Sequence, residues 1–299
     1  MSAIIVHAGA WDIPGDRIQS HKDGCLKALL NGWNVLKEGG SAEEAVEEAI
    51  KAFEDNPEVD SGRGSGLNAT GIIEMDASMM NGTTFRAGAV AAVRNILNPI
   101  SLARKVMNES EHVLLVGEGA NQFAREVGIQ ECSADELVVE RERKKWLEFT
   151  RDRRAETIAN SMDHADTVGA VALDSSGTIV AGTSTGGTPQ KLHGRVGDSP
   201  LIGCGTYADS SVGGISCSGR GENIIKVVLA KTVIDFLAEN GGDPQRAAGD
   251  GISLLDKKVK GTGGVIVIGR GGKVGCAYNT PRFARAYLAS EMGEPVVAI

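Results

Sequence analysis

Apolar and polar residues follow strand-like and helical spacings in turn along the N-terminal part of the chain. Residues 3–7 (AIIVH) form a short apolar run, which predicts a buried strand. Residues 20–38 repeat apolar positions at helical spacing until a Gly-Gly pair ends the pattern. Ser41 and the three residues after it form a capping box, and the apolar residues within 42–53 then fall on one helical stripe. We therefore expect a strand followed by two helices.

The remainder of the first half alternates between short apolar runs and polar connections. In chain order we expect a glycine-rich loop at 59–71, strands at 71–77 and 87–94, a helix beginning at Pro99, a strand at 112–117 and a helix around 120–128. From 133 to 165 the pattern gives way to a polar stretch of interleaved basic and acidic residues. We expect a long loop or linker there, with a solvated helix face as the alternative for its basic cluster.

Strands and helices of the second half come in blocks rather than in regular alternation. In chain order we expect a hairpin of strands at 166–174 and 177–185, a strand at 212–219, one long helix at 222–240, a helix capped by Asp243-Pro244, and a closing hairpin at 263–279. Such blocks favour layered sheets covered by helices over a Rossmann or barrel fold.

Composition and charge are those of an acidic, globular chain. Of its 299 residues, 41% are hydrophobic and 23% charged, which is the balance of a folded protein rather than a disordered one. The net charge is −8. Nucleic-acid binding needs a basic face, so nucleic acid is not expected as a partner. The acidity also argues weakly against an anionic membrane surface.

Cysteine usage and the N-terminus point to an intracellular protein. The five cysteines have no CxxC spacing and predict neither a zinc site nor a disulfide framework. The first residues, MSAIIVHAGAWDIP, lack the charged and apolar regions of a signal peptide. No stretch approaches the roughly 18 apolar residues of a membrane span. We expect a cytoplasmic protein without a membrane partner.

The segment from His164 to Pro200 carries the residues that point to a particular chemistry. It contains TVGAVA from Thr167, TSTGG from Thr183 and GRVGDSP from Gly194, in that order. These residues closely resemble the plant-type asparaginase / isoaspartyl peptidase family, whose relatives include the glycosylasparaginases. Supporting matches lie at 6–10 (VHAGA), 62–68 (GRGSGLN), 75–82 (MDASMMNG) and 117–120 (GEGA).

The resemblance implies a fold and a division of the chain. The fold is the four-layer αββα sandwich of N-terminal-nucleophile hydrolases, an α/β (α+β) architecture. Residues 1–166 would form an α-subunit with a mobile linker at about 133–166, and residues 167–299 a β-subunit that begins with the nucleophile. Both parts would belong to one structural domain, since 166/167 would be a self-cleavage site rather than a domain boundary.

Thr167 is the candidate nucleophile. A threonine hydroxyl is a weak nucleophile until a base removes its proton. If Thr167 becomes an N-terminus, its own α-amine, with an ordinary pKa of about 8, can act as that base without a histidine. This suits a chain whose five histidines show no partner pattern. The alternative is that Thr167 is an ordinary β-branched strand residue.

The resemblance assigns further roles around Thr167. Thr185 would orient the nucleophile, its alternative being a plain turn hydroxyl. The oxyanion hole would be formed by the Ser218 hydroxyl and the Gly219 N–H. A hydroxyl of this kind typically contributes about 2.7–4 kcal/mol of transition-state stabilisation.

The expected substrate contacts follow from the chemistry of an α-amino acid. The guanidinium fork of Arg195 suits an α-carboxylate and the carboxylate of Asp198 suits an α-ammonium. Gly221 would offer its backbone to the substrate amine. The alternative is that Arg195 and Asp198 form a local salt bridge with each other.

Four residues depart from the family pattern. Asp166 precedes the nucleophile where asparaginases usually have Gly and glycosylasparaginases have Asp. Asp60 stands where the family has an Asn that positions the precursor's threonine, Ser218 replaces a Thr, and His7-Ala8-Gly9 replaces His-Gly-Gly. The first two leave the cleavage rate and the substrate preference open.

The resemblance also implies a structural sodium ion bound by backbone carbonyls, while the chemistry itself requires no cofactor. The expected sodium-binding residues are Phe53, Glu54, Asn56, Val59, Ser61 and Arg63.

The expected activity is hydrolysis of L-asparagine and β-aspartyl dipeptides after self-cleavage, through a threonyl acyl-enzyme. The partner would be a small-molecule substrate, and the assembly a homodimer of αβ units. One alternative is a glycosylasparaginase acting on sugar-linked asparagine, which Asp166 favours. A second is an amino-acid-binding homologue that never matures, suggested by the residues at 60 and 166.

Overall fold

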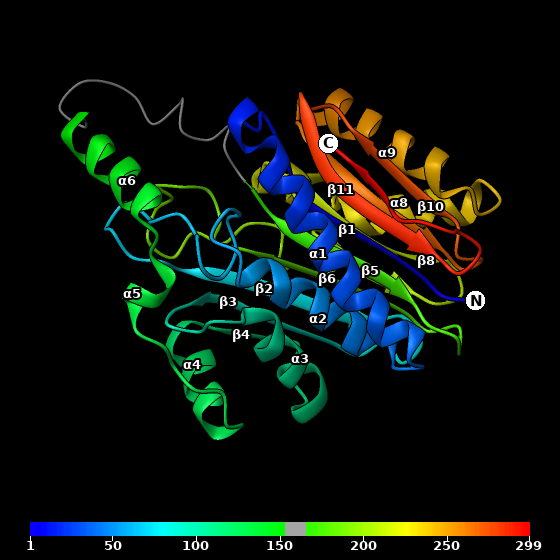
Figure 1. Ribbon diagram of the computed structural model, residues 1–299, viewed down its shortest axis with the longest axis horizontal. Helices are drawn as coiled ribbons and strands as arrows, with labels where there is room; N and C mark the ends of the chain where they lie inside the picture. The colour runs from blue at the N-terminus through cyan, green and yellow to red at the C-terminus, as the bar shows by residue number, and fades with distance from the viewer. Residues whose placement is uncertain (153–165) are drawn as a thin grey trace.

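The chain forms a mixed α/β fold around two β-sheets (Figure 1), in a computed structural model that describes residues 1–152 and 166–299. Within those residues the larger sheet has eight strands. Neighbouring strands are antiparallel except for one parallel pair, β3 with β4. Their order across the sheet is β12 (Val296–Ala298), β11 (Arg282–Ala289), β1 (Ala3–Trp11), β5 (Val168–Leu173), β6 (Ile179–Thr185), β2 (Met75–Asn81), β3 (Ala87–Val93) and β4 (Leu114–Val116).

The smaller sheet packs face to face against the middle of the larger one. Its strands, among the described residues, follow the order β10 (Val274–Tyr278), β9 (Gly263–Gly269), β8 (Gly213–Gly219) and β7 (Thr206–Asp209). Ile5 and Val171 of the larger sheet share a buried cluster with Ile266 and Ile268 of β9. These side chains alternate with residues that point to the opposite face, as the two-residue period of a strand requires.

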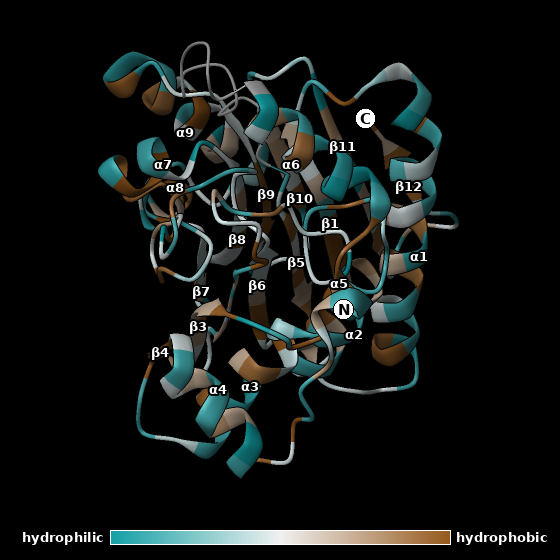
Figure 2. Ribbon diagram, turned by 90° about the vertical axis from the view of Figure 1, so that its left-hand side faces the viewer, coloured by the Kyte–Doolittle hydropathy of each residue, from teal (hydrophilic) through white to brown (hydrophobic). Residues whose placement is uncertain are grey.

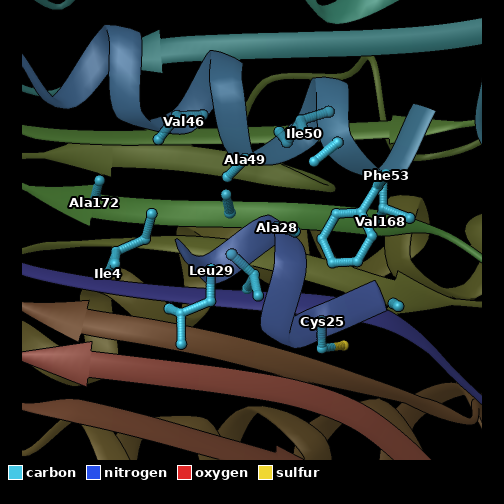
Figure 3. Close-up of a cluster of buried hydrophobic side chains, with 14 of the residues drawn as sticks. Ile4, Cys25, Ala28, Leu29, Val46, Ala49, Ile50, Phe53, Val168 and Ala172 are labelled. Atoms are coloured by element: carbon cyan, nitrogen blue, oxygen red, sulfur yellow. The ribbon is translucent and has the colours of Figure 1, made fainter. Parts of the chain in front are cut away.

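Helices cover the outer faces of both sheets, and the alternate strand residues pack against them. α1 (Ile18–Lys37) and α2 (Ala42–Glu54) pack on the larger sheet, where Leu29 and Phe53 meet Ile4 and Val168 (Figure 3). α3 (Pro99–Glu109) and α4 (Gly117–Glu126) cover β2 and β3, while α7 (Gly221–Val227), α8 (Leu229–Glu239) and α9 (Pro244–Val259) cover the smaller sheet. Figure 2 shows apolar strands inside and hydrophilic residues on the outer surfaces of the helices.

Most of the expected elements are present. The capping box at Ser41 forms, with its hydroxyl accepting from the Glu44 N–H. Asp243 caps α9 by accepting from the backbone N–H groups of Gln245 and Arg246. The hairpins β5–β6 and β9–β10 pair in antiparallel register. The glycine-rich loop contains no helix or strand, and the strand expected at 71–77 begins only at Met75.

Three expectations were wrong in part. The long helix at 222–240 is divided into α7 and α8 at Val228, whose φ is +49°. The chain does not close with the β9–β10 hairpin, because β11 and β12 continue the larger sheet. The polar stretch after 133 contains helices α5 (Ala134–Leu137) and α6 (Glu140–Asp152), so the helix-face alternative holds there. The rest of that expected linker, 153–165, lies outside the described residues.

Over the described ranges, none of the helices combines the length and the apolar character that crossing a membrane would require. The cytoplasmic location stays a prediction.

The break between α7 and α8 yields a prediction about stability. Val228 is exposed and left-handed, a conformation that is costly for a β-branched residue. Val228→Gly is expected to raise the free energy of unfolding by about 1 kcal/mol, measured by urea denaturation. Lys226→Gly is the control, because Lys226 is an exposed residue inside α7, and it should lower that free energy by about 1 kcal/mol. Equal destabilisation by both variants would contradict the prediction.

Candidate active site

The pairing of two strands brings Thr167 beside Thr185. Val168 opposes Ser184 in the β5–β6 ladder, so the preceding residue, Thr167, lies opposite Thr185. Both are buried, and their Oγ1 atoms are 3.4 Å apart, with Thr167 as donor. The predicted neighbourhood of these two hydroxyls is therefore present in the structure, at one end of the larger sheet.

The hydroxyl of Thr185 connects Thr167 to the peptide bond that precedes it. It donates to the carbonyl oxygen of Asp166 at 3.1 Å and accepts from the N–H of Gly187 at 2.9 Å. The three groups thus form a directed relay from the Thr167 hydroxyl, through Thr185, to the carbonyl of residue 166. A donor on a carbonyl oxygen stabilises the negative charge that develops there when a nucleophile attacks.

Ser218 lies at the end of β8 and is fully buried. Its Oγ accepts from the N–H of Ala10 at 3.0 Å, which leaves the hydroxyl proton available for donation. Gly219 follows with a φ of +147°, and a Cβ on it would lie 2.5 Å from the carbonyl oxygen of Thr262, so only glycine fits there. Ser218 is connected to the Thr167 region through Ala10 and the adjacent Gly9, which contacts Asp166.

Arg195, Asp198 and Gly221 lie together, as predicted. A Cβ on Gly221 would be 2.9 Å from the Arg195 guanidinium and 3.0 Å from Oδ1 of Asp198. The expected alternative, a salt bridge between Arg195 and Asp198, is not what the guanidinium makes. Instead, Nε and one terminal nitrogen of Arg195 donate to the two carboxylate oxygens of Glu222 at 2.9 and 3.1 Å. Arg195 therefore holds a carboxylate in the bidentate manner expected for a substrate.

Asp198 is a buried carboxyl group with spare acceptor capacity. Burial raises its pKa to about 7, and the nearby Arg195 opposes the shift. Its Oδ2 has no hydrogen-bond partner among the residues that the structure describes. An incoming ammonium group would satisfy that oxygen and favour the ionised carboxylate.

Asp60 also contacts the site, through the turn that follows Thr185. Its Oδ1 accepts from the Gly66 N–H at 2.7 Å and would lie 2.2 Å from a Cβ on Gly186. The Asp60 carbonyl accepts from the Gly186 N–H at 2.9 Å. Burial raises the pKa of this carboxyl well above its usual value. Asp60 thus packs directly under the turn that carries Thr185.

The sequence did not reveal a column of buried polar side chains between the two sheets. Nε2 of His7 lies 2.9 Å from Oγ of Ser216, which is 2.7 Å from Oγ1 of Thr183. The column continues through Thr206 to Ser78. The spacing could have suggested it, because Ser216 and Thr183 each precede a predicted site residue by two positions and so share its strand face.

The histidines are therefore more involved than their sequence context suggested. His7 is buried in the column, and burial lowers its pKa to about 3, although the backbone of Thr167 opposes this. The ring is consequently neutral at physiological pH. His21 lies beside Asp166, with 3.5 Å between Nε2 and Oδ2.

The comparisons with known proteins identify the family. A sequence model described as asparaginase matches residues 1–297. The chain is 44% identical over 270 residues to the isoaspartyl peptidase/L-asparaginase of Homo sapiens, covering 90% of this chain and 87% of that protein. It is 43% identical over 283 residues to the isoaspartyl peptidase/L-asparaginase of Xenopus laevis, covering 95% of this chain and 91% of that protein. It is 46% identical over an alignment of 312 residues to the plant-type L-asparaginase of Pyrococcus abyssi, covering 100% of both chains. The chain belongs to the asparaginase family.

The loop expected to bind sodium in this asparaginase-family chain curls around two glycines. A Cβ on Gly62 would lie 2.4 Å from the carbonyl oxygen of Glu54, and one on Gly64 would lie 2.7 Å from those of Pro57 and Val59. Two of these carbonyls belong to the expected set. These two are the carbonyls of Glu54 and Val59, and the sodium site stays a prediction.

The side chain of Glu54 points elsewhere, into the protein. Its Oε1 accepts from the Ser184 hydroxyl at 2.7 Å and from the Ile100 N–H at 3.0 Å. Burial raises the pKa of Glu54 to about 8. The protonated acid thus joins the end of α2 to the start of α3 and to the residue before Thr185.

This raised pKa predicts how stability changes with pH. The pKa of Glu54 is higher in the folded protein than its unfolded value of about 4.5, so protonated Glu54 stabilises the fold. This stabilisation is greatest below pH 4.5 and is lost as the pH rises through 8. Glu54→Gln stays uncharged and does not lose this stabilisation. The free energy of unfolding of the variant minus that of the parent should therefore increase between pH 5 and 8.5, by up to about 1.4 kcal/mol per pH unit. Urea denaturation across that range measures it. Glu48→Gln, a half-exposed control on the same helix, should give a flat difference. A flat difference for Glu54→Gln as well would contradict the prediction.

Proposed function

We propose that this protein cleaves itself between Asp166 and Thr167 and then hydrolyses L-asparagine and β-aspartyl dipeptides. The relay from Thr167 through Thr185 to the Asp166 carbonyl is the observation that carries the proposal. It aligns a nucleophile and a proton donor on the same peptide bond before that bond is broken. The names of the relatives, isoaspartyl peptidase/L-asparaginase and plant-type L-asparaginase, support the substrate class.

Self-cleavage begins with attack of the Thr167 oxygen on the carbonyl carbon of Asp166. The Thr185 hydroxyl stabilises the resulting oxyanion. The C–N bond then breaks, the nitrogen of Thr167 takes the proton that its hydroxyl gave up, and residue 166 remains bound to the Thr167 oxygen as an ester. Water hydrolyses this ester and releases residues 1–166 and 167–299 as separate chains. The released α-amine is the base that the next reaction needs.

Hydrolysis by the mature enzyme uses the same oxygen. The α-amine of Thr167 removes the hydroxyl proton, and the oxygen attacks the side-chain carbonyl of the substrate. Ser218 and Gly219 donate to the oxyanion, and the leaving amine departs as ammonia or an amino acid. Water then releases aspartate from the acyl-enzyme. Each step uses groups of this chain and water alone.

Recognition of the substrate requires an exchange at Arg195. Its guanidinium fork holds Glu222, whose side chain is 44% exposed and can turn to the solvent. The substrate α-carboxylate takes that place, while its ammonium group meets Asp198 and the backbone of Gly221. The bidentate contact with Glu222 supports this role, because a carboxylate already fits the fork.

Further parts of the proposal follow from the family. The two face-to-face sheets with helices outside them support the four-layer αββα sandwich of N-terminal-nucleophile hydrolases. A homodimer of αβ units is the proposed assembly. A structural sodium ion would bind at the end of α2 and in the loop after it, to the backbone carbonyls of Phe53, Glu54, Asn56, Val59, Ser61 and Arg63.

A glycosylasparaginase is the second candidate, because that branch shares Asp at position 166. The Gly186-Gly187 turn and the names of the relatives favour the first. Comparing turnover of β-Asp-Leu, asparagine and GlcNAc-asparagine separates the two. The third candidate, a binding protein that never matures, requires that no fragments form and no ammonia is released.

Replacing the nucleophile tests the proposal directly. Thr167→Ala should remain full length and inactive, because no hydroxyl is left to attack, whereas Thr167→Ser should cleave slowly. Intact mass spectrometry follows the cleavage, and ammonia release from asparagine follows the activity. Asparagine hydrolysis by Thr167→Ala at the parental rate would refute the mechanism.

Replacing the oxyanion donor tests Ser218. Because its oxygen already accepts from Ala10, its proton is free to stabilise the oxyanion, and Ser218→Ala should lower kcat by roughly 10²–10³. Ser218→Thr keeps the hydroxyl and serves as the control. Rates are measured on matured protein. A loss below about threefold would move the oxyanion role to backbone donors.

A further inference from the structure

The carboxylate of Asp166 is buried beside His21. Its side chain is 5% exposed, and its Oδ2 lies 3.5 Å from Nε2 of His21, which is fully buried on α1. Oδ1 has no hydrogen-bond partner in the described part of the chain. It occupies the space that Gly9 leaves open, because a Cβ there would lie 1.9 Å from it. The fold thus provides a fitted recess for this side chain.

The other ring nitrogen of His21 contacts the backbone of its own helix. Its Nδ1 lies 2.9 Å from the carbonyl oxygen of Arg17, which can only accept, so Nδ1 carries a hydrogen. In the neutral ring, Nε2 would then present a lone pair to the carboxylate of Asp166. Two facing lone pairs would repel, whereas a proton on Nε2 would attract the carboxylate. Nε2 lies at ion-pair distance from Oδ2 and makes no hydrogen bond within the described residues, so the contact with Asp166 is the polar contact open to it.

Other charged groups around this recess are engaged elsewhere. The small cavity beside Asp166 is also lined by Arg17, Arg141 and Lys145. Arg17 pairs with Glu58, while Arg141 and Lys145 both bind the carboxylate of Glu142. Among residues 1–152 and 166–299, His21 is the ion-pair partner that the Asp166 carboxylate has.

We propose that His21 is a positioning residue for self-cleavage. This role rests on the cleavage proposed above, for which residue 166 is held at two points. Thr185 holds its carbonyl oxygen, and His21 holds its side chain. Together they stop the peptide before Thr167 from rotating away from the attacking oxygen. Holding reactants in an attack geometry lowers the barrier, because rotational freedom has already been removed. After cleavage the task of His21 is complete.

Two substitutions at His21 separate its polar contact with Asp166 from the bulk of its side chain. His21→Gln keeps an N–H near the position of Nε2, and His21→Leu keeps an apolar side chain of moderate size without a donor. Precursor made by cell-free synthesis is sampled over time, and intact mass spectrometry gives the first-order cleavage rate. We expect His21→Leu to cleave about tenfold or more slowly and His21→Gln within about threefold of the parent, because only His21→Leu removes the polar group that faces the buried Asp166 carboxylate.

A double-mutant cycle with Asp166→Gly tests whether the effect passes through the carboxylate. In that background His21→Leu should cause no further slowing, since its partner is absent. Leu29→Ala is the control for damage to α1, because Leu29 is buried on the same helix, and it should leave the cleavage rate within about threefold. Fully matured His21→Leu should hydrolyse asparagine with the parental kcat.

The outcomes distinguish this inference from the proposed function. If the parent cleaves and His21→Leu cleaves at the same rate, the role of His21 is refuted and the proposed function stands. It is also refuted if His21→Leu slows cleavage equally with and without Asp166, since the effect is then structural. If the parent never cleaves, the proposed function fails first and this role with it.

Discussion

The placement of the site depends on the column of buried hydrogen bonds between the two sheets. His7 lies on β1, Ser216 on β8 and Thr183 on β6. Their hydrogen bonds therefore connect two strands of the larger sheet to one strand of the smaller sheet. A buried polar group that loses its partner costs about 1–3 kcal/mol, so these strands cannot slide without breaking a pair. Ser218 and Thr185 lie two residues further along two of those strands. The column thus fixes the distance between Ser218, the proposed oxyanion donor, and Thr185, which is proposed to orient the nucleophile.

Burial around this column also sets the charge of the site. It raises the pKa of Glu54 to about 8 and that of Asp198 to about 7, and it raises the pKa of Asp60 well above the usual value. Carboxyl groups packed this closely into an apolar interior retain protons that solvated ones lose. For Asp198, the ammonium group of the proposed substrate would supply the compensating positive charge.

Local patterns predicted most of the fold because their causes are local. The capping box at Ser41 and the cap at Asp243 satisfy helix N–H groups within three residues. The break at Val228 was missed because apolar residues continue on both sides of it, so the sequence pattern does not mark the turn. The strand β11 was missed because its partner, β1, lies at the opposite end of the chain.

The sequence by itself indicated the residues of the candidate site and the family, because a motif such as GRVGDSP can be recognised without a structure. The resemblance placed Thr185 beside Thr167, and the β5–β6 hairpin brings the two residues opposite each other. Only the tertiary structure decided the partners of the charged groups. Arg195 binds Glu222, and Asp166 lies against His21, 145 positions earlier in the chain. Such pairings depend on how elements that are distant in the sequence pack against each other, which no local pattern specifies.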